Sequence, residues 1–276
     1  MKGNVHDRTV EGFGREWETF DQSRLDHASR AEIFADYFRI FPWDTLPRDA
    51  VGADIGCGSG RWAAIVAPRV GRLFLVDASP RALDVARKNL AGLSNCTFLH
   101  GSVEDLPLAD ASLDFAYCLG VLHHVPDPAA AIRSIALKLK PGAPLLVYVY
   151  YAFDNRPAWF RMLWRTTDLV RRIVSRLPFP LRYVVSQSIA GLVYLPLAGS
   201  ARWLEARGKL PASWPLAYYR HKPFYVMRTD ALDRFGTSLE HRVSRVDLET
   251  MLRDAGFGKI AFADRPPYWC ALGSKP

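Results

Sequence analysis

The stretch that decides the fold is Val51-Gly-Ala-Asp-Ile-Gly-Cys-Gly-Ser-Gly60. Its apolar start, Val51–Ile55, predicts a short strand that runs directly into Gly56, Gly58 and Gly60. Glycines in such a turn allow a tight bend and the close approach of a ligand to bare backbone. A dinucleotide fingerprint needs its third glycine one residue later. The spacing therefore does not match a dinucleotide-binding loop. A lone glycine-rich loop, however, occurs in many α/β proteins.

Strands and helices alternate outward from this loop over residues 50–151. The connection Arg265-Pro266-Pro267 near the C-terminus is too short for a crossover helix, so we expect the last strand to be antiparallel to its neighbour. This alternation predicts a doubly wound, mostly parallel α/β sheet. The expected strands are Val51–Ile55, Arg72–Asp77, Thr97–His100, Leu113–Leu119, Pro144–Tyr150, Lys259–Ala263 and Tyr268–Leu272, and the expected helices are Arg61–Val70, Pro80–Leu90, Asp127–Leu139 and Arg245–Ala255, the last opened by a capping box at Ser244 and Asp247.

Two segments stand outside this core. Residues 1–49 hold an expected helix, Arg30–Phe38, and an aromatic lead with Phe13, Trp17 and Phe20. Residues 152–228 interrupt the alternation after the fifth strand. Between Tyr151 and Arg228 there are 13 Lys/Arg and 3 Asp/Glu, so the positive charge of the chain belongs to this insertion. We expect four parts: an N-terminal cover (1–49), a core (50–151), an insertion (152–228) and the end of the core (229–276).

Two carboxylates accompany the glycine loop. Asp54 precedes Gly56 by two residues and can hold the loop amides or accept from a ligand ammonium group. Asp77 ends the second strand, where an acidic residue can accept from ribose hydroxyls. The alternative for Asp77 is a purely structural role at the start of the helix that follows Ser79. The glycine loop, Asp54 and Asp77 occur together in a strand–loop–helix–strand order, and this combination favours an adenosine-containing cofactor.

At this point the chain resembles a known family. The motifs ADIGCGSG (53–60), LVDAS (75–79), GSVEDLPLADASLDFAYCLGVLHHVPDP (101–128) and LKPGAPLLVYVY (139–150) resemble those of class I S-adenosylmethionine-dependent methyltransferases. Within this family, the motifs most resemble the subgroup that includes the ubiquinone/menaquinone-biosynthesis methyltransferases and many natural-product enzymes. The resemblance covers residues 50–151 and 244–273. It implies a Rossmann-like seven-stranded sheet, S-adenosyl-L-methionine as cofactor, and a helical lid inserted after the fifth strand.

The resemblance also implies roles for individual residues. Leu119 and Gly120 should lie beside the sulfonium. Ser102 departs from the family, which often has Asp at this position, so any contact with the adenine amine is not charge-assisted. The full implied set is Asp54, Gly56, Cys57 and Gly58 around the methionine portion, Asp77 at the ribose, Ala78, Ser102, Val103 and Glu104 at the adenine, and Leu119 and Gly120 at the methyl group.

A sulfonium methyl is already activated, so a base is needed only for a protonated acceptor. His123 and His124 follow the fourth strand, where α/β sheets place ligands, and His124 and His241 are the candidate catalytic residues. The alternative for His123 and His124 is structural packing, and the alternative for His241 is an ordinary surface position. Methyltransferases that act on adenine amino groups or glutamine amides carry an acidic or amide residue followed by Pro-Pro-aromatic after the fourth strand. Here that place reads Leu119-Gly-Val-Leu-His-His, so these two reactions are disfavoured.

The insertion should determine specificity. Trp159–Leu177 predicts a helix with arginines on one face and apolar residues on another, typical either of a lid or of a helix on a membrane surface. We expect a small, partly apolar or anionic acceptor. RNA methylation is the alternative suggested by the basic, aromatic insertion, but no RNA-binding module is appended. A noncatalytic cofactor-binding scaffold is the other alternative. The sequence does not indicate the oligomeric state.

Composition limits the remaining classes. The four cysteines form no C-x-x-C pair and have no histidine at zinc spacing, so neither a metal site nor a disulfide framework is expected. Met1–Thr9 has no secretory h-region. The apolar stretch Tyr183–Ala198 contains polar residues and Pro196 and is expected to fall short of a membrane span. These features predict a cytoplasmic protein.

Overall fold

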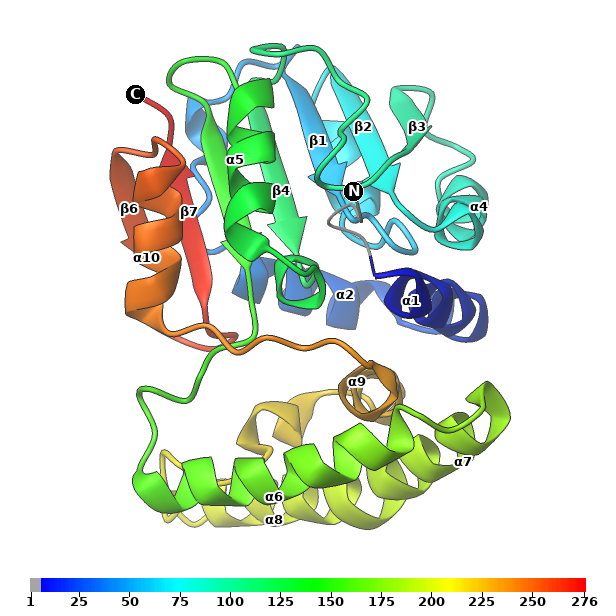
Figure 1. Cartoon of the computed structure of the whole chain (residues 1–276). Coiled ribbons are helices and arrows are strands. Elements are labelled where there is room, and N and C mark those ends of the chain that lie inside the picture. The colour runs from blue at the N-terminus through cyan, green and yellow to red at the C-terminus, as the bar shows by residue number, and fades with distance from the viewer. Residues whose placement is uncertain (1–5) are drawn as a thin grey trace. The chain divides into compact units, whose positions relative to one another are not determined.

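The strand that leads into the glycine loop, β1 (Val51–Ile55), lies inside a seven-stranded sheet in the computed structural model, which describes residues 6–276. The strand order is β3-β2-β1-β4-β5-β7-β6 (Figure 1). The last strand, β7, is antiparallel to β6, as the sequence predicted, and also to β5. The sheet is therefore mostly parallel and doubly wound. The other strands are β2 (Arg72–Asp77), β3 (Cys96–His100), β4 (Phe115–Leu119), β5 (Pro144–Tyr148), β6 (Lys259–Phe262) and β7 (Cys270–Ser274).

The chain divides into two compact units. We call the first the sheet unit; it comprises the chain up to Ser23, Arg30–Ala152 and Leu239–Pro276. The second, the helical unit, comprises Arg24–Ser29 and Phe153–Ser238. The boundary predicted at residue 228 is too early, because α9 (Phe224–Gly236) continues the helical packing beyond it.

Different residues of β4 cover the two faces of the sheet. Ala116 and Cys118 belong to the apolar core shared with α5 (Pro128–Lys138) and α10 (Arg245–Asp254). Tyr117 meets an aromatic cluster at the end of α2 (His27–Tyr37), with its ring 5.1 Å from that of Phe38, the residue after the helix. Alternation of side chains along a strand produces this division. The sheet unit also contains α1 (Asp7–Thr19), η1 (Trp43–Thr45), α3 (Ala63–Val66), η2 (Ala67–Arg69), α4 (Pro80–Asn89) and η3 (Leu122–His124).

Local signals explain where several helices begin and end. Ser79 caps α4 by accepting from Ala82 N–H, and the capping box at Ser244 and Asp247 is confirmed. The helix predicted over Arg61–Val70 is shorter than expected. It gives way to the 3₁₀ turn η2, because Pro68 has no amide hydrogen to donate.

The helical unit contains α6 (Ala158–Val174), α7 (Phe179–Ile189), a π turn η4 (Ala190–Tyr194), α8 (Leu195–Glu205), η5 (Ala217–His221) and α9. Its core includes Val174, Ala190, Tyr194, Met227 and Phe235. Among the described residues, one helix, Phe179–Glu205, is long and apolar enough by length and composition to cross a membrane; it has 27 residues. The expectation that this region falls short was wrong, because Pro196 follows the π turn without breaking the helix.

Candidate functional site

The glycine loop turns sharply after β1. Gly56, Gly58 and Gly60 have φ values of +74°, +54° and +74°, in the left-handed region that favours glycine. The amides of Gly56 and Cys57 donate to Val76 O, at 2.7 and 3.1 Å, so the end of β2 holds the first turn of the loop. The loop conformation therefore requires glycine regardless of any ligand.

Asp77 links the loop to α4. Its Oδ2 accepts from Gly58 N–H at 2.9 Å and its Oδ1 accepts from Ser79 N–H at 2.8 Å. Burial raises the pKa of Asp77, and these two amide hydrogen bonds oppose that rise. Asp77 thus has the structural role that the sequence left open, and it also lies in the cavity wall described below. A carboxylate can accept further hydrogen bonds beyond these two.

Asp54 is almost completely buried beneath the loop. Burial raises its pKa to about 8, while the neighbouring Tyr117 hydroxyl opposes that rise. The Tyr117 hydroxyl lies near this carboxyl, but neither it nor Asp54 Oδ2 forms a hydrogen bond of standard length and angle within the described part of the chain. A buried carboxylate oxygen without a donor is costly, and a ligand ammonium group would supply one.

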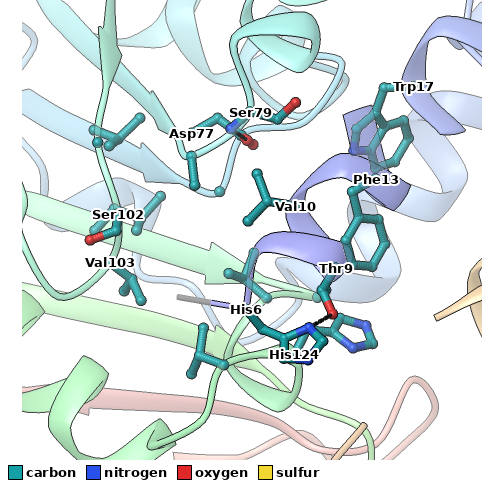
Figure 2. Close-up of a pocket in the computed structure, with 18 of the residues that line it drawn as sticks. His6, Thr9, Val10, Phe13, Trp17, Asp77, Ser79, Ser102, Val103 and His124 are labelled. Carbon is teal, nitrogen blue, oxygen red and sulfur yellow. Dashed lines mark hydrogen bonds between the residues drawn. The ribbon is translucent and has the colours of Figure 1, made fainter. Parts of the chain in front are cut away.

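A cavity opens at the carboxyl ends of β1, β2 and β4. It has about 800 Å³ of empty space including its mouth. Figure 2 shows Val10, Phe13 and Trp17 on α1 at one side, with Asp77 and Ser79 on another and Ser102 and Val103 on a third. The lining residues are His6, Thr9, Val10, Phe13, Trp17, Ile55, Gly56, Val76, Asp77, Ala78, Ser79, Gly101, Ser102, Val103, Leu119, Gly120, Val121, His124 and Val125.

Most of the residues expected to hold the cofactor meet in this wall. Gly56, Asp77, Ala78, Ser102, Val103, Leu119 and Gly120 line it, whereas Asp54, Cys57, Gly58 and Glu104 do not. Trp17 packs directly on Gly58, so that a Cβ at Gly58 would lie 2.7 Å from the indole. The roles of all these residues in binding stay predictions.

The helix α1 was not predicted from the sequence, which indicated only an aromatic lead with Phe13, Trp17 and Phe20 in an N-terminal cover. Val10, Phe13 and Trp17 have the three- and four-residue spacing of one helical face, which is the signal that indicates the helix. Trp17 lines the cavity, but Phe20 is buried elsewhere. Gly14 lets α1 approach α4, since a Cβ there would lie 2.6 Å from Ser79 Oγ.

The two histidines after β4 have different environments. His124 lines the cavity, and its Nδ1 lies 2.8 Å from Leu239 O. A carbonyl can only accept, so Nδ1 carries the hydrogen and Nε2 is the basic nitrogen. His123 is fully buried and stacks on Tyr150 with ring centres 3.8 Å apart. Burial and the neighbouring His124 lower the pKa of His123 well below its usual value, so it is neutral.

His241 does not lie in the cavity wall. Its backbone N–H donates to His123 O at 2.8 Å, which ties the returning chain to η3. Next to it, Arg242 donates to Glu240 at 2.8 Å and lies 4.7 Å above the Tyr150 ring. The described geometry therefore gives His241 a backbone contact near the site, while His124, like His6 on the N-terminal side, lines the cavity.

The residues fit an adenosyl cofactor with a charged amino-acid end. The positive-φ glycine loop exposes backbone, Asp77 and Ser102 offer oxygen acceptors in the wall, and Asp54 has an unpartnered buried oxygen. Over residues 6–276, no three His, Cys, Asp or Glu side chains gather in a way that could hold a metal ion.

Comparison with known proteins agrees with this geometry. The family model described as "Methyltransferase domain" matches residues 53–147. The chain is 30% identical over 185 residues to the ubiquinone biosynthesis O-methyltransferase of Xanthomonas oryzae pv. oryzae (strain PXO99A), covering 63% of this chain and 72% of that protein. It is 35% identical over 104 residues to the uncharacterized methyltransferase YcgJ of Bacillus subtilis (strain 168), covering 37% and 41%.

Solved structures share the fold. An S-adenosylmethionine-dependent methyltransferase from Thermotoga maritima has a TM-score of 0.53 at 17% identity, over 96% of this chain and 99% of that one. One from Methanosarcina mazei has a TM-score of 0.50 at 19% identity, over 84% and 95%. At these identities the likeness concerns the fold alone.

Proposed function

Because this chain belongs to the class I S-adenosylmethionine-dependent methyltransferases, we propose that it methylates a hydroxyl oxygen of a small, partly apolar or anionic acceptor. The choice of oxygen is based on His124, because a hydroxyl acceptor needs a base. His124 lines the cavity, and its Nδ1–H donates to Leu239 O. A relative named as an O-methyltransferase supports the same choice. A cytoplasmic location is part of this proposal.

The chemistry assigns one task to His124. S-adenosylmethionine supplies, when bound, a sulfonium methyl group that an acceptor oxygen can attack, which leaves S-adenosylhomocysteine. A hydroxyl is a weak nucleophile until its proton moves to a base. His124 Nε2 is buried in this structure, so the acceptor must displace the groups that cover it before this nitrogen can take the hydroxyl proton. Leu239 O would then stabilise the imidazolium through Nδ1–H. The imidazolium would afterwards release this proton to water and return to the neutral base.

The apolar part of the wall defines the class of acceptor. Val10, Phe13, Leu119, Val121 and Val125 line the same cavity as His124, and the ring of Phe13 lies 4.9 Å from that of His124. Such a surface favours an acceptor with a ring or chain over a strongly hydrated one. It also excludes water from the methyl group, which favours transfer to the acceptor over hydrolysis.

The test substitutes His124 and varies the acceptor atom. We expect His124→Gln to lower kcat by about 10²–10⁴-fold, the usual contribution of a general base, while S-adenosylhomocysteine affinity stays within about twofold. His241→Gln is the matched control and should retain kcat. Release of S-adenosylhomocysteine is measured with ring compounds that differ only in carrying a hydroxyl, an amine or a thiol. Turnover of the amine alone, or full activity of His124→Gln, would contradict the proposal.

We also propose that the helical unit determines which acceptor is used. The chain leaves the sheet unit at Ala152 and returns at Leu239. Ala152 N–H donates to Val243 O at 3.0 Å, and Leu239 O accepts from His124. Both connections of the helical unit therefore join the sheet unit beside η3, next to the candidate base. This attachment supports a role of the helical unit in acceptor choice.

A further inference from the structure

The helix α6 exposes an apolar stripe. Residues 159, 162, 163, 166, 169, 170 and 173 follow the spacing of one helical face. All of them except Thr166 are large apolar residues, and Met162 and Ile173 are each 65% exposed. Monomeric soluble proteins rarely leave a contiguous stripe of this kind in water. The stripe members are Trp159, Met162, Leu163, Leu169, Val170 and Ile173.

The opposite side of α6 is the one that the helical unit buries; besides Val174 it carries a charged pair. Asp168 and Arg171 are buried there and form an ion pair of 2.7 Å. Arg171 also donates to Thr237 O, just after the end of α9, at 2.9 Å. These contacts hold this side inward. The exposed apolar stripe is therefore not a core face that has failed to pack.

The continuous helix Phe179–Glu205 has a second exposed apolar face. Leu181, Val184, Leu192, Leu195 and Trp203 are exposed on it, Leu192 at 79%. Ala190, Tyr194 and Ala198 on the same helix are buried in the core with α9. The helix thus has one side in the core of the helical unit and one apolar side in solvent.

Arginines accompany these apolar faces. At 100° per residue, Arg161, Arg165 and Arg172 form a row on α6 directly beside the stripe, and Arg176 follows in the turn after the helix. In the described part of the chain, the side chains of Arg165, Arg176 and Arg202 form no ion pair. Phe153–Ser238 contains 14 Lys/Arg and 5 Asp/Glu, a balance of +9. Apolar side chains bordered by cations match the headgroup and acyl boundary of an anionic bilayer.

We propose that the helical unit binds the surface of a membrane containing anionic lipids, with α6 and the Phe179–Glu205 helix lying along the surface. The side of the long helix that faces α9 cannot enter lipid while the unit stays folded. Arg182 there donates to Gly236 O at 2.8 Å, and Arg228 donates to Gln187. Lipid contact is thereby restricted to the exposed faces, and the helix does not cross the bilayer. This inference goes beyond the proposed reaction, because it concerns where the enzyme works.

Vesicle flotation of the full-length protein tests the proposal. Wild-type protein should float with vesicles of phosphatidylcholine and phosphatidylglycerol, and much less with phosphatidylcholine alone. Ile173→Glu combined with Leu192→Glu should reduce binding at least roughly tenfold through lost apolar burial. Arg165→Gln, Arg176→Gln and Arg202→Gln together should reduce it on the order of 100-fold, since each cation near such a surface contributes roughly fivefold.

Matched controls distinguish a membrane from other partners that could cover the exposed apolar faces. Val246, on α10 of the sheet unit, is 70% exposed, and Val246→Glu should leave flotation unchanged. Circular dichroism must show each variant folded. High salt at alkaline pH should release the bound wild-type protein, whereas a spanning helix would be retained and would overturn the surface orientation. Absence of wild-type flotation would overturn the proposal. If the wild-type protein instead sediments as a dimer and Ile173→Glu makes it a monomer, the stripe is an interface with a second copy of the chain, which would also overturn the proposal.

Discussion

At the scale of single residues, Asp54 combines a buried position with an oxygen that has no donor. Its carboxyl lies below the glycine loop, where burial raises its pKa to about 8. The sequence indicated an acid at this position, but not that the protein would hold it largely protonated near neutral pH. An ammonium group of a bound ligand would favour the ionised form.

The raised pKa of Asp54 predicts a pH-dependent stability. In an unfolded chain the Asp pKa is about 3.9, so between about pH 4 and 8 the folded protein holds more protons at this site. Raising the pH through that range therefore favours unfolding. Asp54→Asn stays neutral and lacks this component. Its free energy of unfolding should improve relative to wild type as pH rises toward 8, by at most about 1.4 kcal/mol per pH unit.

Urea unfolding of both proteins at pH 5, 6, 7 and 8 measures this difference. The other ionisable groups are common to both proteins and cancel in the comparison. Parallel stability curves would mean that Asp54 is ionised in the folded protein throughout.

At the scale of elements, α1 and the glycine loop form one wall of the cavity. Gly58 accommodates the indole of Trp17, and Gly14 accommodates Ser79 at the start of α4. An exposed ion pair of 3.0 Å between Arg81 and Glu18 adds little to this packing. The position of α1 thus depends on two glycines, each of which contacts a different element.

This packing predicts a coupling between Gly58 and Trp17. Gly58→Ala places a Cβ 2.7 Å from the indole and forces a left-handed alanine. We expect it to lower stability by about 1–2 kcal/mol from the backbone alone and to weaken S-adenosylhomocysteine binding further by displacing Trp17. In the Trp17→Ala background the second effect should disappear, with a coupling of about 1 kcal/mol in calorimetric titrations.

Gly142→Ala is the matched control for the backbone contribution. Gly142 has φ +80° but open space at its Cβ position. It should lose stability like Gly58→Ala without losing affinity for the ligand. Strictly additive effects at Gly58 and Trp17 would show that the indole does not transmit the substitution.

At the scale of the whole molecule, the helical unit enters and leaves the sheet unit at one place. Tyr151 forms a bridge with Val243, and Val243 N–H donates to Tyr150 O at 2.9 Å. The two ends of the insertion are thus held together by the sheet unit itself. A short linker can join them without strain on the sheet.

Replacement of Phe153–Ser238 by a short Gly/Ser linker should therefore leave a folded sheet unit. Every cavity-lining residue lies outside the removed segment, so S-adenosylhomocysteine affinity should fall by less than about tenfold, or 1.4 kcal/mol. Transfer to the acceptor identified with the intact enzyme should disappear. Full transfer without the helical unit would contradict its proposed role in acceptor choice, and loss of ligand binding in a folded product would show that the cavity depends on it.

The sequence by itself determined the sheet and the position of the ligand loop, because both depend on local patterns. The run of apolar residues into Gly56, the acid at Asp77 and the capping box at Ser244 each act over a few residues and can be recognised there. Only the tertiary structure decided that α1 contributes to the cavity and that His124, rather than His241, faces it. It also decided which side of α6 is exposed. The row of apolar residues on α6 would ordinarily predict the buried face, but the Asp168–Arg171 pair is buried in its place. Periodicity identifies the faces of a helix, whereas the choice of the face that packs depends on partners that are distant in sequence.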